Sequence, residues 1–371
     1  MARTTTETRR ARPGASMPPA QRPILRGAGL GGHPDVVFDG RTAYDFFISL
    51  NVAAGEDSDL LPEDATWLRR SRKSLAEPVR DCLDVCFGDQ SMDAFHALPS
   101  LLVARPDIKD ARSFVAALDE IPDEGIVRLL VEDIVRHVEG ADLVERVIRG
   151  EEKALAVVQT KFEEWDKAPI VGFLRDPQPS VDKMRRVVEA WLPLYQAVED
   201  RVASVLEQDL KDRKSDRASM DPATLIERTT GGLRWLPEPP VRRVIMAPSY
   251  FARPYNYIYQ AHDWRLFAYP VADSALGSLD AAVPPQAVVR LYRALGDATR
   301  MRILKLLTDR DRYLTELAQQ LELSKPTMKH HLALLRAAGL VTVTEQGSLT
   351  YYSLRRERLA EAGAELSSFL A

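Results

Sequence analysis

The sequence predicts a mainly α protein of the α+β class, with a helical N-terminal body that ends in a small β-hairpin region and a C-terminal winged helix-turn-helix. Three observations predict this fold. Apolar residues recur three and four positions apart over most of residues 42–211, the pattern changes to period two after Leu233, and the last 86 residues combine short helices with a hairpin. The chain of 371 residues suffices for two to three domains of roughly 100–200 residues.

The first elements form the predicted body. Residues 1–33 are rich in Thr, Arg, Pro and Gly without apolar periodicity, which predicts a disordered basic arm. Residues 34–280 are predicted to form a regulatory or effector domain of unknown ligand. Its expected elements are a strand at 36–38, helices at about 42–53, 64–87, 107–119, 123–138, 141–168 and 181–211, and strands at 241–246 and 264–270. An Ala-, Gly- and Pro-rich stretch at 274–285 is the candidate linker.

Charge and cysteine content restrict the function classes. The net charge of -4 combines +5 in residues 1–29, +4 from Gln286 onward and -13 between them. This distribution permits one end of the chain, and not its whole surface, to contact a polyanion. No apolar run approaches the ~20 residues of a spanning helix, and no secretory signal is expected. Two cysteines predict a reducing compartment, so a cytoplasmic protein is expected.

Residues 284–371 are predicted to be the winged helix-turn-helix. Helices are expected at 287–294, at 298–307 with Asp297 as the N-cap, at 313–321, and at 325–338 with Gly339 as the C-cap. Strands at 341–344 and 349–354 and a helix at 357–369 complete the module. In such a module the helix after the tight turn lies in the major groove of DNA.

The helix at 325–338 has the side chains expected of a DNA-reading helix. Ser324 caps it, and Leu332, Leu334 and Leu335 form the inward stripe, which leaves Lys325, Thr327, Met328, Lys329 and His330 near the exposed first turns. These side chains offer donors for phosphates and base edges and methyl-bearing groups for thymine. A solvated helix face is the alternative. Arg336 is expected to contact the DNA backbone or solvent.

These residues resemble the ArsR/SmtB-type winged-helix repressors. The matching text begins with Leu295-Gly-Asp-Ala-Thr-Arg-Met-Arg-Ile-Leu, continues with Leu314-Thr-Glu-Leu-Ala, and ends with Leu323-Ser-Lys-Pro-Thr-Met-Lys-His-His-Leu-Ala-Leu-Leu-Arg-Ala-Ala-Gly-Leu-Val. The resemblance implies a homodimer, paired through the first and last helices of the module, on a palindromic double-stranded operator, usually as a repressor. It places Ser324, Lys325, Thr327, Lys329 and His330 on the DNA-facing helix, His331 inside, and Gln346 and Ser348 at the wing tip.

The chain departs from the metal-sensing members of that family. Residues 314–321 contain no Cys, and residues 355–371 contain no His or Cys, so neither familiar metal site is present. No metal and no cofactor are therefore predicted. The body resembles the uncharacterised domain that precedes such helices in some larger regulators, with residues 248–254 as a similar segment, and this resemblance implies no ligand.

Two features of the body have a functional and a structural interpretation. Tyr255, Tyr257 and Tyr259 alternate, so on a strand they would share one face and line a pocket for a small organic effector, or form part of a hairpin core. Cys82 and Cys86, with His96 nearby, would bind zinc or sense oxidants, or pack as small apolar residues. Structural packing is the favoured interpretation of both.

The sequence therefore predicts a one-component transcription regulator that is not an enzyme and has no catalytic residue. Two alternatives remain: an enzyme with an appended DNA-targeting module, and a protein-interaction body with a winged helix that binds protein. The sequence contains no G-x-x-x-x-G-K-[ST], H-E-x-x-H or G-x-S-x-G motif. The operator, the regulated genes and the effector are not specified by the sequence.

Overall fold

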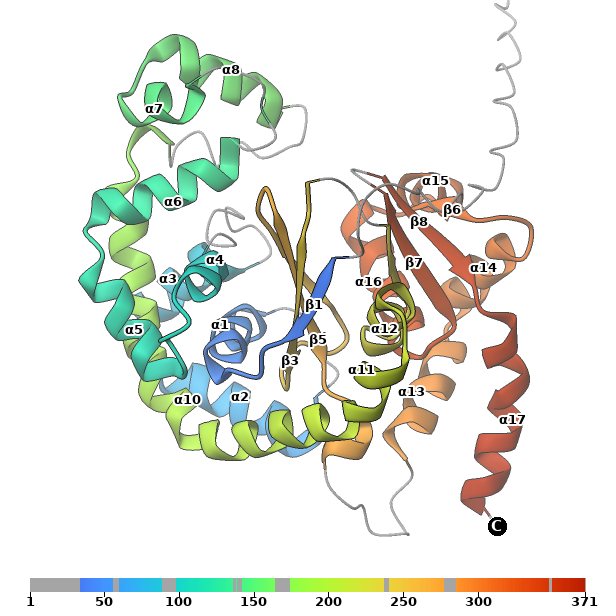
Figure 1. Ribbon diagram of the computed structural model, residues 1–371. Helices are drawn as coiled ribbons and strands as arrows, with labels where there is room; N and C mark the ends of the chain where they lie inside the picture. Colours follow the sequence, from blue (N-terminus) through green and yellow to red (C-terminus); the bar gives the residue numbers. More distant parts are fainter. Residues whose placement is uncertain are drawn as a thin grey trace, which may run out of the picture. The chain divides into compact units, whose positions relative to one another are not determined.

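Two four-stranded sheets organise the part of the chain that the computed structural model describes (Figure 1). The described residues are 34–55, 60–88, 98–135, 138, 142–163, 174–236, 240–276, 285–346 and 349–370. The predicted basic arm at 1–33 and most of the candidate linker lie outside these ranges. None of the described helices is both long enough and apolar enough to cross a membrane.

The first sheet, called the body sheet here, has the strand order β1-β3-β5-β4. Its strands are β1 (Asp35–Phe38), β3 (Arg243–Ser249), β4 (Tyr257–Gln260) and β5 (Trp264–Pro270). The predicted hairpin of the strands near 241–246 and 264–270 is wrong, because β3 and β5 run parallel, with Ile245 opposite Leu266. The intervening segment is long enough to hold β4, which pairs antiparallel with β5 at the sheet edge.

Alternate residues of β3 and β5 belong to two different hydrophobic cores. Ile245 and Ala247 of β3 belong to the core of the helical body, whereas Val244 and Met246 belong to a second core shared with the C-terminal region. Figure 1 shows the sheet standing between these two groups of helices. Since successive side chains of a strand point to opposite faces, a strand buried on both faces is apolar at nearly every position.

Helices make up the rest of the body; most of them lie on the body side of this sheet, whereas the last belongs to the second core through Ile226. They are α1 (Thr42–Ala53), α2 (Pro62–Ser74), α3 (Glu77–Phe87), α4 (Leu98–Ala104), α5 (Ala111–Glu120), α6 (Asp123–Val135), α7 (Leu143–Ile148), α8 (Glu152–Glu163), α10 (Gln178–Asp212), α11 (Lys214–Ser219) and α12 (Pro222–Thr229), with a short 3-10 helix at Asp273–Leu276. The predicted helix at 64–87 is two helices, because Leu75 and Ala76 are extended before Pro78. The predicted helix at 141–168 is also interrupted, at Gly150, whose φ is 70°.

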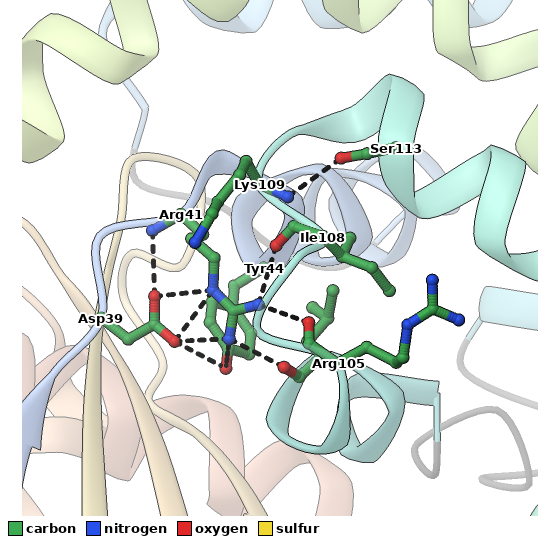
Figure 2. A network of polar contacts seen from close by, with 8 residues as sticks. Asp39, Arg41, Tyr44, Arg105, Ile108, Lys109 and Ser113 are labelled. Atoms are coloured by element: carbon green, nitrogen blue, oxygen red, sulfur yellow. Dashed lines mark hydrogen bonds and ion pairs between the residues drawn. The ribbon is translucent and has the colours of Figure 1, made fainter.

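Arg41 joins the start of α1 to the end of α4 (Figure 2). Its guanidinium pairs with the Asp39 carboxylate at 2.6 Å and donates to the Tyr44 hydroxyl at 2.9 Å. It also donates to three backbone carbonyls, those of Leu102, Arg105 and Ile108, at 2.8, 3.0 and 2.7 Å. The carbonyls at a helix end lack intrahelical donors, so this arginine stabilises the α4 terminus and has a structural role.

The second sheet, called the wing sheet here, has the order β2-β7-β8-β6. Its strands are β2 (Leu233–Trp235), β6 (Arg312–Tyr313), β7 (Val341–Gln346) and β8 (Leu349–Leu354). The helices α13 (Gln286–Leu295), α14 (Ala298–Leu307), α15 (Leu314–Leu321), α16 (Lys325–Ala337) and α17 (Arg356–Leu370) accompany it. The prediction of a helical body followed by a winged helix-turn-helix is thus confirmed.

The wing sheet includes a strand from the body. β2 precedes the module by about fifty residues and pairs parallel with β7, with Leu233 opposite Val343. The second core likewise contains Trp235 and Phe267 together with the interior of the C-terminal helices. An ion pair from Arg290 of α13 to Asp273, which also pairs with Arg253, adds a polar link. The body and the module therefore share a core across the predicted boundary at 280–284.

Candidate nucleic-acid interface

The helix-turn-helix consists of α15, a tight turn and α16. Glu322 takes the left-handed conformation with φ 57°, and the amide of Leu323 donates to the Ala318 carbonyl at 2.9 Å, which ends α15. Ser324 then caps α16 by accepting from the Thr327 amide at 3.2 Å, and Pro326 occupies the first turn, where no intrahelical donor is needed. This local chemistry sets the direction of α16.

The first turns of α16 present polar side chains to solvent. Ser324, Lys325, Thr327 and Lys329 are exposed, as the sequence predicts, and His330 is half-buried. None of these residues is acidic, and the two lysines are one helical turn apart on the same side. The arrangement supplies cations and hydroxyl donors at the helix end that enters a groove in DNA-binding modules of this kind.

Met328 is a correction to the predicted DNA-contacting set. Its side chain is fully buried and belongs to the second core with Leu332 and Leu335. These three residues lie four and three positions apart, so they form the inward stripe of the helix. Leu334, which the sequence analysis placed inward, is half-buried instead. Met328 thus stabilises α16 and is not available to a thymine methyl group.

The other end of α16 and the wing complete the module. Gly339, with φ 74°, ends α16, and Leu340 donates to the Leu335 carbonyl at 2.9 Å, as predicted for a glycine C-cap. Asp297 caps α14 by accepting from the Arg300 amide at 2.8 Å. Gln346 is the last residue of β7, whereas Ser348 lies outside the described residues.

Arg336 is a second correction, because it contacts neither solvent nor a free surface. It is only 7% exposed and donates to the carbonyls of Thr230 at 2.9 Å and Pro254 at 2.7 Å. Both carbonyls belong to the body. The face of α16 that carries Arg336 therefore contacts the body, and α16 is held by these hydrogen bonds as well as by the second core.

The body also reaches a predicted DNA-reading side chain. The Tyr255 hydroxyl lies 3.2 Å from Nδ1 of His330. His331, which follows it, points elsewhere: it is mostly buried near Asp297, and burial lowers the pKa of its imidazole. The two rings are 6.0 Å apart between centroids, consistent with successive helix positions facing different directions.

The predicted tyrosine pocket is wrong for two of its three members. Tyr257 and Tyr259 are buried in the core of the body, where the Tyr259 ring meets that of Phe47 edge-on at 6.3 Å. Alternation along β4 does place them on one face, as predicted, but that face packs on helices. Tyr255 precedes the strand and lines a cavity beside α16 together with Asn256. No signal in the sequence distinguishes this tyrosine from the other two.

Cys82 and Cys86 lie buried in the body, as cysteines with a structural role do. Cys82 and Cys86 are free and buried, and desolvation raises the pKa of the Cys86 thiol to about 12. A thiol so protected from ionisation is a poor nucleophile and a poor metal ligand. Their predicted partner His96 lies outside the described residues. Within the described ranges, no three His, Cys, Asp or Glu side chains are grouped so as to hold a metal ion.

Comparison with known proteins matches the C-terminal region. A family model described as "Helix-turn-helix domain" matches residues 295–344. The regulator KmtR of Mycobacterium tuberculosis is 39% identical over 74 residues, which are 20% of this chain and 57% of KmtR. The regulator CmtR of the same organism is 44% identical over 80 residues, 22% of this chain and 68% of CmtR.

A solved structure titled "Possible transcriptional regulator for arsenical resistance" shares 32% identity, covers 22% of this chain and 85% of its own, and has a TM-score of 0.20. The residues that the family model matches, 295–344, run from the end of α13 into β7, so they include the turn, α16 and part of the first wing strand. The chain spans little more than half of KmtR and about two thirds of CmtR. Through its C-terminal region the chain belongs to the ArsR/SmtB-type winged helix-turn-helix family, and it is a DNA-binding transcription regulator.

Proposed function

We propose that the protein is a homodimeric repressor, located in the cytoplasm, that binds a palindromic operator through α16 and the wing and whose body senses an effector without catalysis. The observation that carries the proposal is the exposed, acid-free first half of α16, with Lys325, Thr327 and Lys329 on a helix capped by Ser324. Cations at this position gain affinity by neutralising phosphates, and hydroxyl donors add base or backbone contacts.

Exposed apolar residues support the dimer. Tyr292 of α13 and Leu359 of α17 are each 38% exposed, and Leu370 is 72% exposed. The Tyr292 hydroxyl donates to the Ala362 carbonyl at 3.1 Å, so α13 and α17 lie against each other. Contiguous exposed apolar residues mark interaction surfaces, and the resemblance to the family implies pairing through these same two helices.

The interior of the body supports a non-catalytic role. Asp45 is fully buried and accepts from the Ser249 hydroxyl, from the Phe251 amide at 3.2 Å and from the Tyr195 hydroxyl at 3.1 Å. A carboxylate satisfied in this way, away from solvent, stabilises packing and cannot reach a substrate. Arg336 and Tyr255 connect the body to α16, and the body is proposed to transmit a signal to this helix through their contacts.

The DNA contact is tested by Lys325→Ala combined with Lys329→Ala. We expect this double variant to bind the duplex upstream of the protein's own gene about 10- to 100-fold more weakly at moderate salt, with a shallower salt dependence, because two phosphate contacts are lost. Fluorescence anisotropy at two salt concentrations, with a scrambled duplex as competitor, measures both effects.

The matched control is Lys153→Ala combined with Lys214→Ala, which removes the same charge from exposed positions on α8 and α11. This control should bind DNA as the wild type does. Equal weakening in both double variants would indicate a general effect of net charge and would remove α16 as the contact surface.

The dimer is tested by Leu359→Arg. A charge at the exposed apolar face of α17 should convert the protein to a monomer with intact circular dichroism, as measured by sedimentation velocity, and weaken binding to a palindromic duplex. Val157→Arg, on the exposed part of α8, is the control. A wild-type protein that sediments as a monomer at all concentrations, or a Leu359→Arg variant that stays dimeric, would contradict this part of the proposal.

A further inference from the structure

A cavity of about 550 Å³ lies where the body meets α16 and the wing sheet. It is bordered by α16, by β7 and β8, and by β2 and the start of β4 from the body. This volume is in the range of sites that bind small organic molecules. The cavity is not the DNA-facing surface itself, because its far wall belongs to the body.

The lining has a distinct chemical character. Ile258 and Leu233 of the body and Leu332 and Val343 of the module all line the cavity, so both parts of the chain contribute apolar side chains. Lys329 and Arg336 also line it, and no Asp or Glu stands among its described lining residues. Arg336 already donates to two carbonyls, whereas Lys329 is exposed to solvent. A largely apolar cavity that is lined by a lysine and by no acidic residue favours an apolar anion.

Asn256 contributes a buried hydrogen-bond acceptor to the lining of the cavity. Its Nδ2 donates to the Thr230 carbonyl at 3.0 Å, which fixes the orientation of the carboxamide. Its Oδ1 is buried and has no hydrogen-bond partner within the described part of the chain. A buried acceptor without a donor costs free energy, so a ligand with an N–H or O–H group would be favoured at this place.

We propose that this cavity is the effector site and that it binds an aromatic organic acid carrying a hydrogen-bond donor. The acid group pairs with Lys329, the ring packs between Ile258 and Leu332, and the donor group contacts Oδ1 of Asn256. Because Lys329 also belongs to the DNA-contacting turns, ligand and operator compete for the same ammonium group. The competition rests on the proposed function, whereas the binding of the acid does not.

The test uses the full chain and two fluorescent probes. Anilinonaphthalene sulfonate has an aromatic framework, an acid group and an N–H donor, and phenylnaphthylamine is its neutral counterpart. We expect the sulfonate to bind saturably, one molecule per chain, and Ile258→Trp, which fills the cavity, to weaken its binding at least about tenfold. Lys329→Gln should weaken the sulfonate about two- to fivefold and leave the neutral probe unchanged.

Val85→Trp is the matched control, because it places the same side chain at an exposed position of α3. Wild-type sulfonate affinity in Ile258→Trp, or equal loss in Val85→Trp, would overturn the site. If Ile258→Trp does not fold, the contrast between the two probes in Lys329→Gln decides: equal changes for both would overturn the proposal.

Binding of the upstream duplex is measured in the same samples with and without the sulfonate. Weaker duplex binding in the presence of the sulfonate, absent in Ile258→Trp, supports competition, and duplex binding unaffected by a saturating probe overturns it. A wild type that binds the probe as expected but no duplex would contradict the proposed function and leave the cavity assignment standing.

Discussion

The body and the C-terminal module differ in the charged side chains that they bury. Among the described residues, the body buries Arg253, which pairs with Asp273, and the carboxylates of Asp45, Asp64 and Asp209, to each of which a tyrosine hydroxyl donates. The module buries only arginines, and each donates to backbone carbonyls: Arg300 to Arg293 and Ala294, Arg312 to Leu306, and Arg336 to Thr230 and Pro254.

The difference lies in where the partners come from. Arg300 and Arg312 are satisfied by carbonyls six or seven residues away, at ends of neighbouring helices of the module. The buried aspartates are satisfied by residues sixty or more positions distant, except for the helical neighbour Arg213 of Asp209. Of the three arginines, only Arg336 donates to residues that are far away in the sequence. A buried charge with local partners stabilises one element, and one with distant partners fixes how elements pack.

The strongest test of this comparison is Arg336→Met. The substitution keeps apolar bulk but leaves the carbonyls of Thr230 and Pro254 without a donor, so we expect a loss of about 2–4 kcal/mol in the free energy of unfolding. Urea denaturation of the full chain measures this loss. Arg302→Met, at an exposed position on α14, should change stability by less than about 0.5 kcal/mol. A comparable small change in Arg336→Met would show that the body does not hold α16.

Asp45→Asn tests the buried carboxylate of Asp45 through the pH dependence of the free energy of unfolding. Desolvation raises the pKa of Asp45 to about 6, above its ordinary value of 3.8. The folded state therefore binds the proton more tightly than the unfolded state, so the contribution of this group to stability falls as pH rises from about 4 to about 6. Asparagine does not titrate. The variant should gain on the order of 3 kcal/mol relative to wild type between pH 4 and pH 7.

The measurement is urea denaturation of both proteins at several pH values in that interval. Asparagine retains an acceptor for Ser249 and Phe251, and its Nδ2 can donate to the Tyr195 oxygen, so the variant should fold. A stability difference that is constant with pH would mean that Asp45 titrates normally.

The smallest expected effect is that of Tyr255→Phe. It removes only the hydroxyl that lies 3.2 Å from His330 Nδ1, a contact worth about 0.5–1.5 kcal/mol. If this contact holds His330 away from DNA, the variant should bind the operator duplex about two- to tenfold more tightly. Anisotropy titration beside the wild type checks this result. Unchanged or weaker binding would show that the contact does not restrain the recognition helix.

Local sequence signals predicted the C-terminal module well. The Ser324 cap, the Asp297 cap and the Gly339 terminus each depend on atoms within a few residues, and all three are present as expected. Met328 was misassigned because the inward stripe of α16 was drawn through Leu332, Leu334 and Leu335, whereas the structure buries Met328 and leaves Leu334 half-buried. The exposure of Lys325, Thr327 and Lys329 follows from the same periodicity.

The body was predicted less well, because its contacts join distant segments. The alternation of Val244 to Ala247 indicates a strand but not the direction of its neighbour, so β3 and β5 were assigned as a hairpin, whereas they run parallel. The residues that line the cavity come from β2, β4, α16 and the wing, which are far apart in the chain. No periodic pattern in any one of them indicates the others.

The sequence by itself determined the helices of the C-terminal module, the order of its winged helix-turn-helix and the family to which that region belongs, because caps, turns and amphipathic stripes are encoded within single elements. The tertiary structure decided the rest. It placed β2 in the wing sheet, Arg336 under the body and Tyr255 against His330. These contacts form because separate segments bury their apolar faces and backbone carbonyls together. Only the packed chain brings those segments into contact.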